Sequence, residues 1–219
     1  MRPCKLLSVL LSAAIALTLL TGAIAAPILC RPFYYAHIGP LELEERTGLT
    51  REEIRTAYDE MLDYCLGGEE FSTGVLKWSQ SGKDHFTDVR VLFLLDLRVF
   101  AAGAAAIVLL LVAGRLRRRS PARLLGRGPC FWAGAGLGGA FLIVGGLAAL
   151  DFDRAFTVFH TIFFPGKTNW LFDPDTDQII NILPETFFMD CAILILAVLV
   201  IGCAALILAD FLAGRDRRT

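Results

Sequence analysis

The sequence predicts an all-α membrane protein with four transmembrane helices and a small, mostly helical extracytoplasmic cap. Hydrophobic residues make up 55% of the 219 residues and the mean hydropathy is +0.58, which is more apolar than a water-soluble surface tolerates. A bilayer core of about 30 Å needs roughly 20 apolar residues in a helix, and four stretches reach that length. Charged residues are also distributed unequally between the segments that connect these stretches, as expected for a chain with two differently charged faces.

Two of the four stretches are uncharged, and two carry ionisable residues near their ends. The second contains Asp96 and Arg98 near its start, and the fourth contains Asp190 early and Asp210 late. Charge inside a bilayer is costly unless it is paired or functional, so these residues deserve notice as site candidates. The predicted transmembrane helices are residues 6–26, 91–114, 131–150 and 186–213.

The first stretch has a competing interpretation as a signal peptide. Ala23-Ile24-Ala25 resembles a signal-peptidase site, and a short basic start with Arg2 and Lys5 precedes the apolar run. The run of 21 residues exceeds the usual hydrophobic region of a signal peptide. We therefore expect an uncleaved first helix, which also gives the other helices a consistent orientation.

The distribution of arginine predicts the orientation. The connecting segment 115–130 has six arginines and no acid, so it is expected in the cytoplasm together with the tail after the fourth helix. Segments 27–90 and 151–185 are acid-rich and are expected outside, so that both termini are cytoplasmic. The net charge of −1 averages a basic and an acidic face and indicates no nucleic-acid partner. The arginines concerned are Arg115, Arg117, Arg118, Arg119, Arg123 and Arg127, followed in the tail by Arg215, Arg217 and Arg218.

The first outer segment contains one well-marked helix. Thr50 is suited to cap it, Glu53 completes a capping box, and Gly67 with Gly68 provides a stop. Its apolar stripe predicts packing rather than catalysis. The stripe consists of Ile54, Ala57, Tyr58, Met61, Leu62 and Cys65.

The rest of the outer segments is less regular. Residues 71–78 suggest a short strand, and the helix of the second stretch is expected to start near the polar sequence 84–90, so that His85 and Asp88 share a helix face. Residues 156–174 are rich in aromatic side chains and predict a loop that lies against the membrane. A short helix is expected over 175–183, ending before Pro184.

Several other patterns favour ordinary structural roles. Cys30 and Cys65 share the outer side, but whether they pair is open. The glycines 134, 136 and 139 have the spacing of a dinucleotide-binding loop, yet they lie in an apolar stretch and predict close helix packing. His37 is expected to be an interfacial residue without a catalytic role, and no metal-binding His-Glu-x-x-His pattern occurs.

Four outer motifs resemble the bacterial lipoprotein intramolecular transacylases, which are four-span membrane enzymes. The motifs are KDHFTDVR at 83–90, FHTIFF at 159–164, Asn169-Trp170 and ILPE at 182–185. The resemblance implies an acyltransferase of the bacterial plasma membrane with its active site on the outer face. It would move the sn-2 acyl chain of a lipoprotein diacylglyceryl group to the N-terminal cysteine amine and give a lyso-form lipoprotein. It assigns the central chemistry to His85 and His160, with lipoproteins and lipid as partners and no cofactor.

This chemistry is within the reach of two histidines. Acyl migration from oxygen to nitrogen needs a base for the amine, a donor for the tetrahedral oxyanion and a proton for the departing alcohol. One histidine can serve as base and then acid while the other holds the oxyanion, although the sequence does not say which does which. We expect orienting roles for Asp88, Asp96, Arg98, Glu185 and Asp190, and contact with substrate for Trp170, Phe163 and Phe164.

Two other functions remain open at this point. A non-enzymatic membrane protein could use the outer helix and the aromatic segment to bind lipid or another protein. A lipid hydrolase could use the same two histidines with water as the nucleophile. The preferred lipoprotein, the acyl chain and the oligomeric state are also open.

Overall fold

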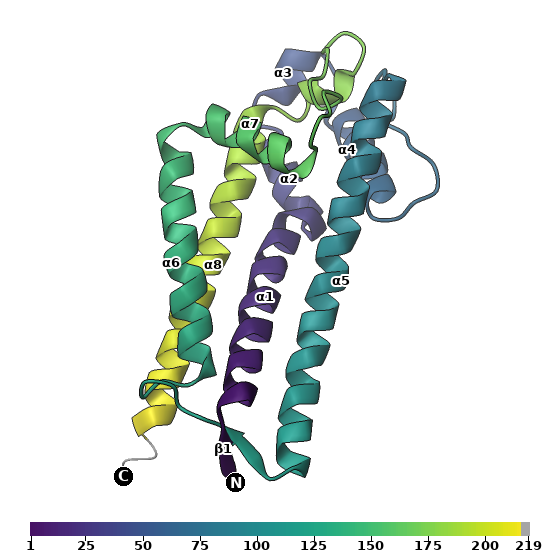
Figure 1. Ribbon diagram of the computed structural model, residues 1–219. Coiled ribbons are helices and arrows are strands. Elements are labelled where there is room, and N and C mark those ends of the chain that lie inside the picture. Colours follow the sequence, from purple (N-terminus) through teal and green to yellow (C-terminus); the bar gives the residue numbers. More distant parts are fainter. Residues whose placement is uncertain (216–219) are drawn as a thin grey trace. The chain divides into compact units, whose positions relative to one another are not determined.

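The computed structural model describes residues 1–215, with side chains as far as Gly214, and is mostly helical (Figure 1). Four helices are long and apolar enough to cross a membrane: α1, α5, α6 and residues Glu185–Gly214 of α8. The predicted fold class is therefore confirmed. The elements are β1 (Arg2–Cys4), α1 (Lys5–Leu29), α2 (Arg31–His37), α3 (Leu43–Thr47), α4 (Arg51–Cys65), α5 (Gln80–Leu116), β2 (Arg119–Pro121), α6 (Pro129–Leu150), α7 (Phe152–Phe163), the 3-10 helix η1 (Gln178–Asn181) and α8 (Glu185–Arg215).

The four predicted apolar stretches lie within these four long helices. At about 1.5 Å per residue, the 37 residues of α5 extend well beyond a bilayer core of about 30 Å. The residues at which each helix enters the bilayer stay a prediction. The tail arginines that contributed to the predicted orientation, Arg217 and Arg218, and the side chain of Arg215 lie outside the described residues.

The chain divides into two compact units. The first unit consists of residues 1–24, 96–147 and the chain from Leu194 on. The second unit consists of residues 25–95 and 148–193. The second unit contains most of the polar segments between the apolar helices, together with both histidines of the quoted motifs.

Small residues let the helices of the first unit approach closely. A β-carbon on Gly103 would come within 2.5 Å of the Thr18 hydroxyl, and one on Gly134 within 2.7 Å of the Cys203 carbonyl oxygen. Such contacts are typical of packed membrane helices. The predicted packing role is thus confirmed for Gly134, but Gly136 and Gly139 face open space, because only one side of α6 contacts α8.

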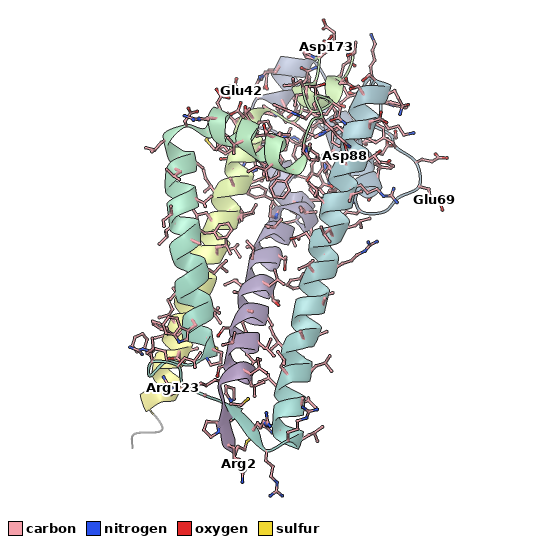
Figure 2. All side chains as sticks on the ribbon, viewed as in Figure 1. Arg2, Glu42, Glu69, Asp88, Arg123 and Asp173 are labelled. Carbon is pink, nitrogen blue, oxygen red and sulfur yellow. The ribbon has the colours of Figure 1, made fainter. Side chains whose placement is uncertain are left out.

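A buried carboxylate organises the connection between α5 and α6 in the first unit. Asp210 Oδ2 accepts a hydrogen bond from Arg123 Nη2 at 3.0 Å, and its Oδ1 accepts one from the Gly128 amide at 2.8 Å. Nearby, β1 and β2 form a parallel pair in which Arg2 is opposite Arg119 (Figure 2 labels Arg2 and Arg123). The charge at the end of the fourth apolar stretch therefore serves a structural purpose.

Helix α4 of the second unit forms as the sequence predicts. Thr50 Oγ1 accepts a hydrogen bond from the Glu53 amide at 3.3 Å, and Glu53 Oε2 accepts one from the Thr50 amide at 2.8 Å, which completes the capping box. All six residues of the predicted apolar stripe are buried. Burial of this stripe makes α4 a core element of the second unit.

Tyr34 is the centre of that core. Its side chain is fully buried, its ring stacks on Tyr58 with centroids 3.7 Å apart, and its hydroxyl donates to the Ile182 carbonyl at 2.9 Å. Tyr34 therefore joins α2, α4 and the segment that follows η1. Residues that are far apart in the sequence meet at this one aromatic side chain.

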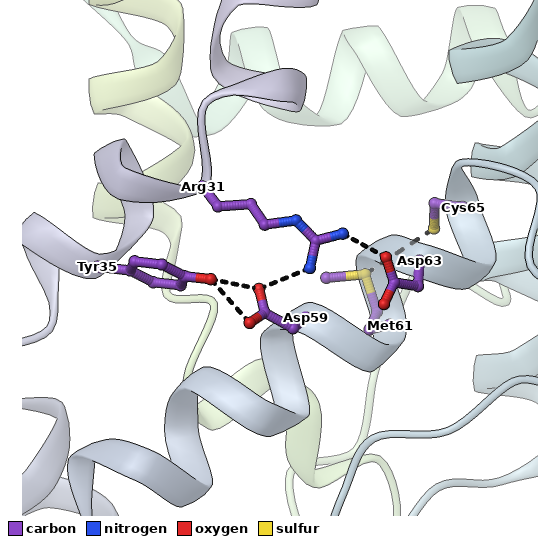
Figure 3. Close-up of polar contacts among 6 residues, drawn as sticks. All are labelled: Arg31, Tyr35, Asp59, Met61, Asp63 and Cys65. Atoms are coloured by element: carbon purple, nitrogen blue, oxygen red, sulfur yellow. Dashed lines mark hydrogen bonds and ion pairs between the residues drawn. The ribbon is translucent and has the colours of Figure 1, made fainter.

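An arginine fastens α2 to α4 at the edge of the same core (Figure 3). Arg31 pairs with Asp59, with Nη1 and Oδ1 2.9 Å apart, and also with Asp63. The Tyr35 hydroxyl donates to the Asp59 carboxylate at 2.7 Å. The charged side of α4 is thus used for attachment as well as for solubility.

Three features of the second unit differ from the sequence-based expectation or were left open by it. Residues 71–78 form turns instead of a strand, because Gly74 has a positive φ of 59° and the Leu76 amide bonds back to the Thr73 carbonyl. The short helix expected over 175–183 is a single 3-10 turn, η1. Cys30 is exposed and Cys65 is buried, and both are free thiols.

Candidate active site

His85 lies on the second turn of α5, close to where that helix begins. The start of α5 is fixed by Asp177, whose carboxylate accepts hydrogen bonds from the Ser79 amide at 2.7 Å and the Ser79 hydroxyl at 2.8 Å. His85 itself is only 5% exposed. Helix α5 starts at Gln80, four residues before the polar sequence 84–90 near which we expected its start, so the whole of that sequence is helical.

His160 lies on α7, which the sequence did not predict as a helix. Asp151 caps α7 by accepting a hydrogen bond from the Arg154 amide at 3.0 Å. The helix exposes Val158 and Ile162 and buries His160, so it has one apolar exposed face and one packed face. The predicted aromatic loop is thus wrong for residues 156–163, which belong to α7. The β-branched and aromatic residues there lower intrinsic helix propensity, and tertiary packing overrides that preference.

The structure brings the two histidines together within the second unit. Their ring centroids are 5.9 Å apart and their planes are inclined by 30°. Phe164 is buried against both rings, with centroids 4.9 Å from His85 and 5.6 Å from His160. An aromatic wall therefore holds two imidazoles from separate helices side by side.

The surroundings of His160 define its tautomer. Its Nδ1 lies 2.8 Å from the Phe156 carbonyl oxygen, which can only accept, so Nδ1 carries the proton and Nε2 has the free lone pair. Burial lowers the pKa of His160 below its ordinary value of 6.5, although the Phe156 carbonyl opposes this shift. The ring also stacks on Trp170, with centroids 4.6 Å apart. His160 is therefore a neutral base near pH 7.

His85 is held mainly by aromatic rings. Besides Phe164, its ring contacts Phe172 at a centroid distance of 5.3 Å. Its Nδ1 is buried and has no hydrogen-bond partner among the described residues. Buried polar atoms are nearly always satisfied in proteins, so an unpartnered ring nitrogen beside a second histidine indicates a place for a reacting group.

The sequence suggested that Asp88 contacts the His85 ring, but its carboxylate has other partners. Although the two residues are three apart on α5, the Asp88 carboxylate accepts a hydrogen bond from Asn169 Nδ2 at 3.1 Å and pairs with Lys167 Nζ. The expectation that Asp88 orients the His85 ring is therefore corrected. The loop after α7 supplies the donors that bind this carboxylate instead.

The other expected orienting residues have different surroundings. Asp190 pairs with His37, with Oδ2 and Nε2 3.4 Å apart. Asp190 was expected to orient a site histidine, but its partner is the histidine for which no catalytic role was expected. Glu185 lines a separate open cleft with Asp153. Asp96 and Arg98 belong to the first unit, where neither forms an ion pair with another described residue. None of these four residues forms an ion pair with His85 or His160 among the described residues.

The aromatic residues expected to bind substrate differ in exposure. Phe164 is buried, Trp170 is partly exposed, and Phe163 is 49% exposed and packs on Phe159. Sequence reasoning gave no site role to four residues that shape the site, although Asn169 belonged to a quoted motif: Phe156, Lys167, Asn169 and Phe172. The spacing of Phe156, His160 and Phe164, each four residues apart, is the signal that could have revealed α7.

The two neighbouring imidazoles of the site can accept and donate protons. In the part of the chain that the structure describes, no group of three or more His, Cys, Asp or Glu side chains is arranged to hold a metal ion. Two imidazoles near an aromatic wall offer one base and one donor or acceptor. That is the set of groups that acyl transfer to an amine requires.

Comparison with known proteins identifies the family. The family model described as lipoprotein intramolecular transacylase Lit matches residues 9–188. The chain belongs to the Lit family. It is accordingly a lipoprotein intramolecular transacylase, an acyltransferase with lipoprotein as its substrate, and a multi-pass membrane protein. Curated protein sequences give no match to the chain.

Solved structures of a Lit protein have the same fold. The in meso structure of the membrane integral Lit from Bacillus cereus is 26% identical, covers 98% of each chain and has a TM-score of 0.85. Structures of the Bacillus cereus protein with the mutations H85R and H85A, in that protein's numbering, are each 23% identical and have a TM-score of 0.80. They cover 98% of this chain and 93% and 96% of their own, and they support the fold alone.

Proposed function

We propose that the enzyme moves the sn-2 acyl chain of a lipoprotein diacylglyceryl group to the amine of the N-terminal cysteine, with His160 as base and His85 as oxyanion donor. The observation that carries this proposal is the pair of buried imidazoles with centroids 5.9 Å apart. The Phe156 carbonyl, which keeps the proton of His160 on Nδ1, supports the assignment of the base.

The first step makes the new bond. His160 Nε2 accepts a proton from the substrate amine, and the amine nitrogen attacks the carbonyl carbon of the sn-2 ester. A C–N bond forms, and the former carbonyl oxygen carries the negative charge. His85 donates a hydrogen bond to that oxyanion, since one of its ring nitrogens is free of protein partners.

The second step breaks the old bond. The tetrahedral intermediate collapses, the bond between the acyl carbon and the glycerol oxygen breaks, and His160 returns its proton to that oxygen. No water and no external nucleophile takes part, so the product is an isomer of the substrate. Because amine and ester belong to one molecule, positioning can contribute about 7 kcal/mol or more to lowering the barrier.

The aromatic surroundings favour transfer over hydrolysis. Phe164 and Phe172 pack against His85, and Trp170 stacks on His160. Such rings exclude water from the two imidazoles, and a dry site protects the sn-2 ester from attack by water in place of the amine.

A model lipopeptide tests the proposed reaction. We expect incubation of a synthetic diacylglyceryl-cysteine peptide with the purified enzyme to leave its mass unchanged while fragmentation moves one acyl chain to the cysteine nitrogen. A mass reduced by one fatty acid would instead indicate a hydrolase. An unchanged fragmentation pattern would indicate a binding protein and would overturn the proposal.

The acid limb of the pH profile is expected below pH 6.5. Neutral His160 is the active base, and burial lowers its pKa, so the base form persists as the pH falls through 6.5 and is lost only at lower pH. Trp170→Ala exposes the ring to water and should move the acid limb of kcat up toward 6.5. Measurements of kcat at saturating substrate from pH 4 to 9 check this; an unmoved limb in the variant would argue against His160 as the base.

We further propose that the active site faces outward from the bacterial plasma membrane and that both termini are cytoplasmic. The six arginines of segment 115–130 support this orientation through the positive-inside tendency. In a variant whose exposed thiol is removed by Cys30→Ser, labelling with a membrane-impermeant maleimide should modify a cysteine introduced at Glu69 but not one introduced at Arg118 in intact cells. The reverse labelling would contradict the orientation.

A further inference from the structure

An open cleft lies beside Asp88, one helical turn along α5 from His85. Its volume is about 380 Å³, and it belongs entirely to the second unit. Figure 2 labels Asp88 among the side chains of that unit. The cleft is lined by Asp84, Thr87, Asp88, Lys167 and Asn169.

The Asp88 carboxylate in this cleft is paired with the ammonium group of Lys167. Lys167 Nζ pairs with Oδ1, and the lysine side chain is 48% exposed. An exposed ion pair of this kind contributes little net free energy, because water screens it and a long flexible side chain must be ordered. Another ammonium group of suitable position can therefore take the place of Lys167 at modest cost.

Asn169 also lines this cleft and carries a second acceptor atom beside Asp88. Its Nδ2 donates to Asp88 Oδ2 at 3.1 Å, and this bond fixes the orientation of the amide because a carboxylate cannot accept from an oxygen. Its Oδ1 is buried without a hydrogen-bond donor from any described residue. A buried amide oxygen without a donor is costly, so a ligand that supplies an N–H is favoured there.

The cleft is connected to both histidines through neighbouring residues. Asp88 follows His85 by three residues on α5 and shares its helix face. Asn169 precedes Trp170, whose ring stacks on His160. A group bound between Asp88 and Asn169 is therefore held by the same two segments that position the imidazoles.

We infer that Asp88 and Asn169 bind the α-ammonium group of the lipoprotein's N-terminal cysteine, and that Lys167 occupies this place in the absence of substrate. This inference rests on the proposed function, because it places the amine that the proposed reaction acylates. The ammonium group has three N–H bonds. One is donated to Asp88 and one to Asn169 Oδ1, and the third proton leaves to solvent through the open cleft, which frees the nitrogen lone pair. As the neutral amine attacks, one of its two remaining protons passes to His160 Nε2, which later returns it to the glycerol oxygen, and the last N–H stays in the amide product.

The same arrangement explains how product leaves. After transfer, the nitrogen is part of an amide with one N–H and no charge. It can no longer satisfy both acceptors or replace the charge of Lys167. Lys167 then returns to Asp88, and the acylated terminus is released.

A binding comparison tests the inference without turnover. In the His160→Ala background, we expect a diacylglyceryl-cysteine peptide with a free amine to bind roughly tenfold more tightly than its N-acetylated counterpart, measured with enzyme in lipid nanodiscs. Asp88→Asn should reduce this preference to near unity. Glu69→Gln, which removes the same charge from an exposed position of the second unit (Figure 2), should leave it unchanged.

Lys167→Gln should change the affinity for the free-amine peptide in the opposite direction from Asp88→Asn. Removing the competing cation should strengthen binding of the free-amine peptide by about two- to fivefold and leave the acetylated peptide unaffected. A merely structural role for the Lys167–Asp88 pair predicts weaker binding of both peptides. A lower kcat with unchanged binding would make Lys167 a donor to the ester and would overturn the inference.

The inference and the proposed function can fail separately. If the unmodified enzyme leaves the lipopeptide acyl groups in place, the proposed reaction is wrong whatever the binding preference. Acyl transfer together with an Asp88→Asn variant that still prefers the free-amine peptide would show that only the inference is wrong. Equal weakening of the binding of both peptides by Asp88→Asn would show the same.

Discussion

Replacing His160 with alanine is expected to lower kcat for acyl transfer by about 10²- to 10⁴-fold, the range typical of losing a positioned general base. The fold should persist, because α7 keeps its capping residue Asp151 and its exposed apolar face. Fragmentation of the model lipopeptide over time measures the rate, and circular dichroism checks the helix content.

His85→Ala is expected to lower kcat by about 10²- to 10³-fold, as for loss of one oxyanion donor. The double variant should be little worse than His160→Ala alone, because residues that act as a unit lose their effects non-additively. His37→Ala is the matched control. His37 is also a histidine of the second unit, but it pairs with Asp190 instead of the motif histidines, so its removal should leave kcat within about twofold, as expected for a group that takes no part in the chemistry. Full activity of either motif variant would contradict the proposed mechanism.

Tyr34→Ala is expected to lower the free energy of unfolding by about 3–5 kcal/mol, the cost of truncating a large buried aromatic side chain. The change removes the stacking on Tyr58 and leaves the Ile182 carbonyl without its donor. Because both histidines lie in the second unit, its loosening should also reduce activity. Thermal unfolding in detergent, compared with the unmodified enzyme, measures the effect.

Two milder substitutions separate the contributions. Tyr34→Phe keeps the ring and should cost about 1–3 kcal/mol for the unsatisfied carbonyl. Tyr35→Phe removes a more exposed hydroxyl whose partner Asp59 keeps its pairing with Arg31, so it should cost less than Tyr34→Phe. Equal costs for the two phenylalanine variants would show that burial does not set the value of the Tyr34 hydrogen bond.

The parts of the fold that were predictable depend on local patterns. Apolar length predicts the long helices, because a helix in lipid must satisfy its own backbone and present about 20 apolar residues. Thr50 and Glu53 predict the start of α4, since a capping box needs only residues three apart. The stripe from Ile54 to Cys65 follows the helical period and is buried as expected.

The parts that were not predictable depend on contacts between distant residues. Helix α7 is not evident from propensity, because it forms where aromatic residues pack around His85 and His160. The partner of Asp88 is 81 residues away at Asn169, so no spacing rule indicates it. The expected contact with His85 was the one available locally.

The sequence by itself determined the membrane class, the number of long apolar helices, the capped helix α4 and, through its motifs, the two histidines that are site candidates. Only the tertiary structure decided that these histidines are neighbours, that the Phe156 carbonyl sets the tautomer of His160, and that Asp88 pairs with Lys167 and Asn169. The physical reason is the distance along the chain over which each kind of interaction acts. Hydrophobic length and capping act within a few residues, whereas proton position and ion pairing depend on which segments the fold brings within hydrogen-bonding distance.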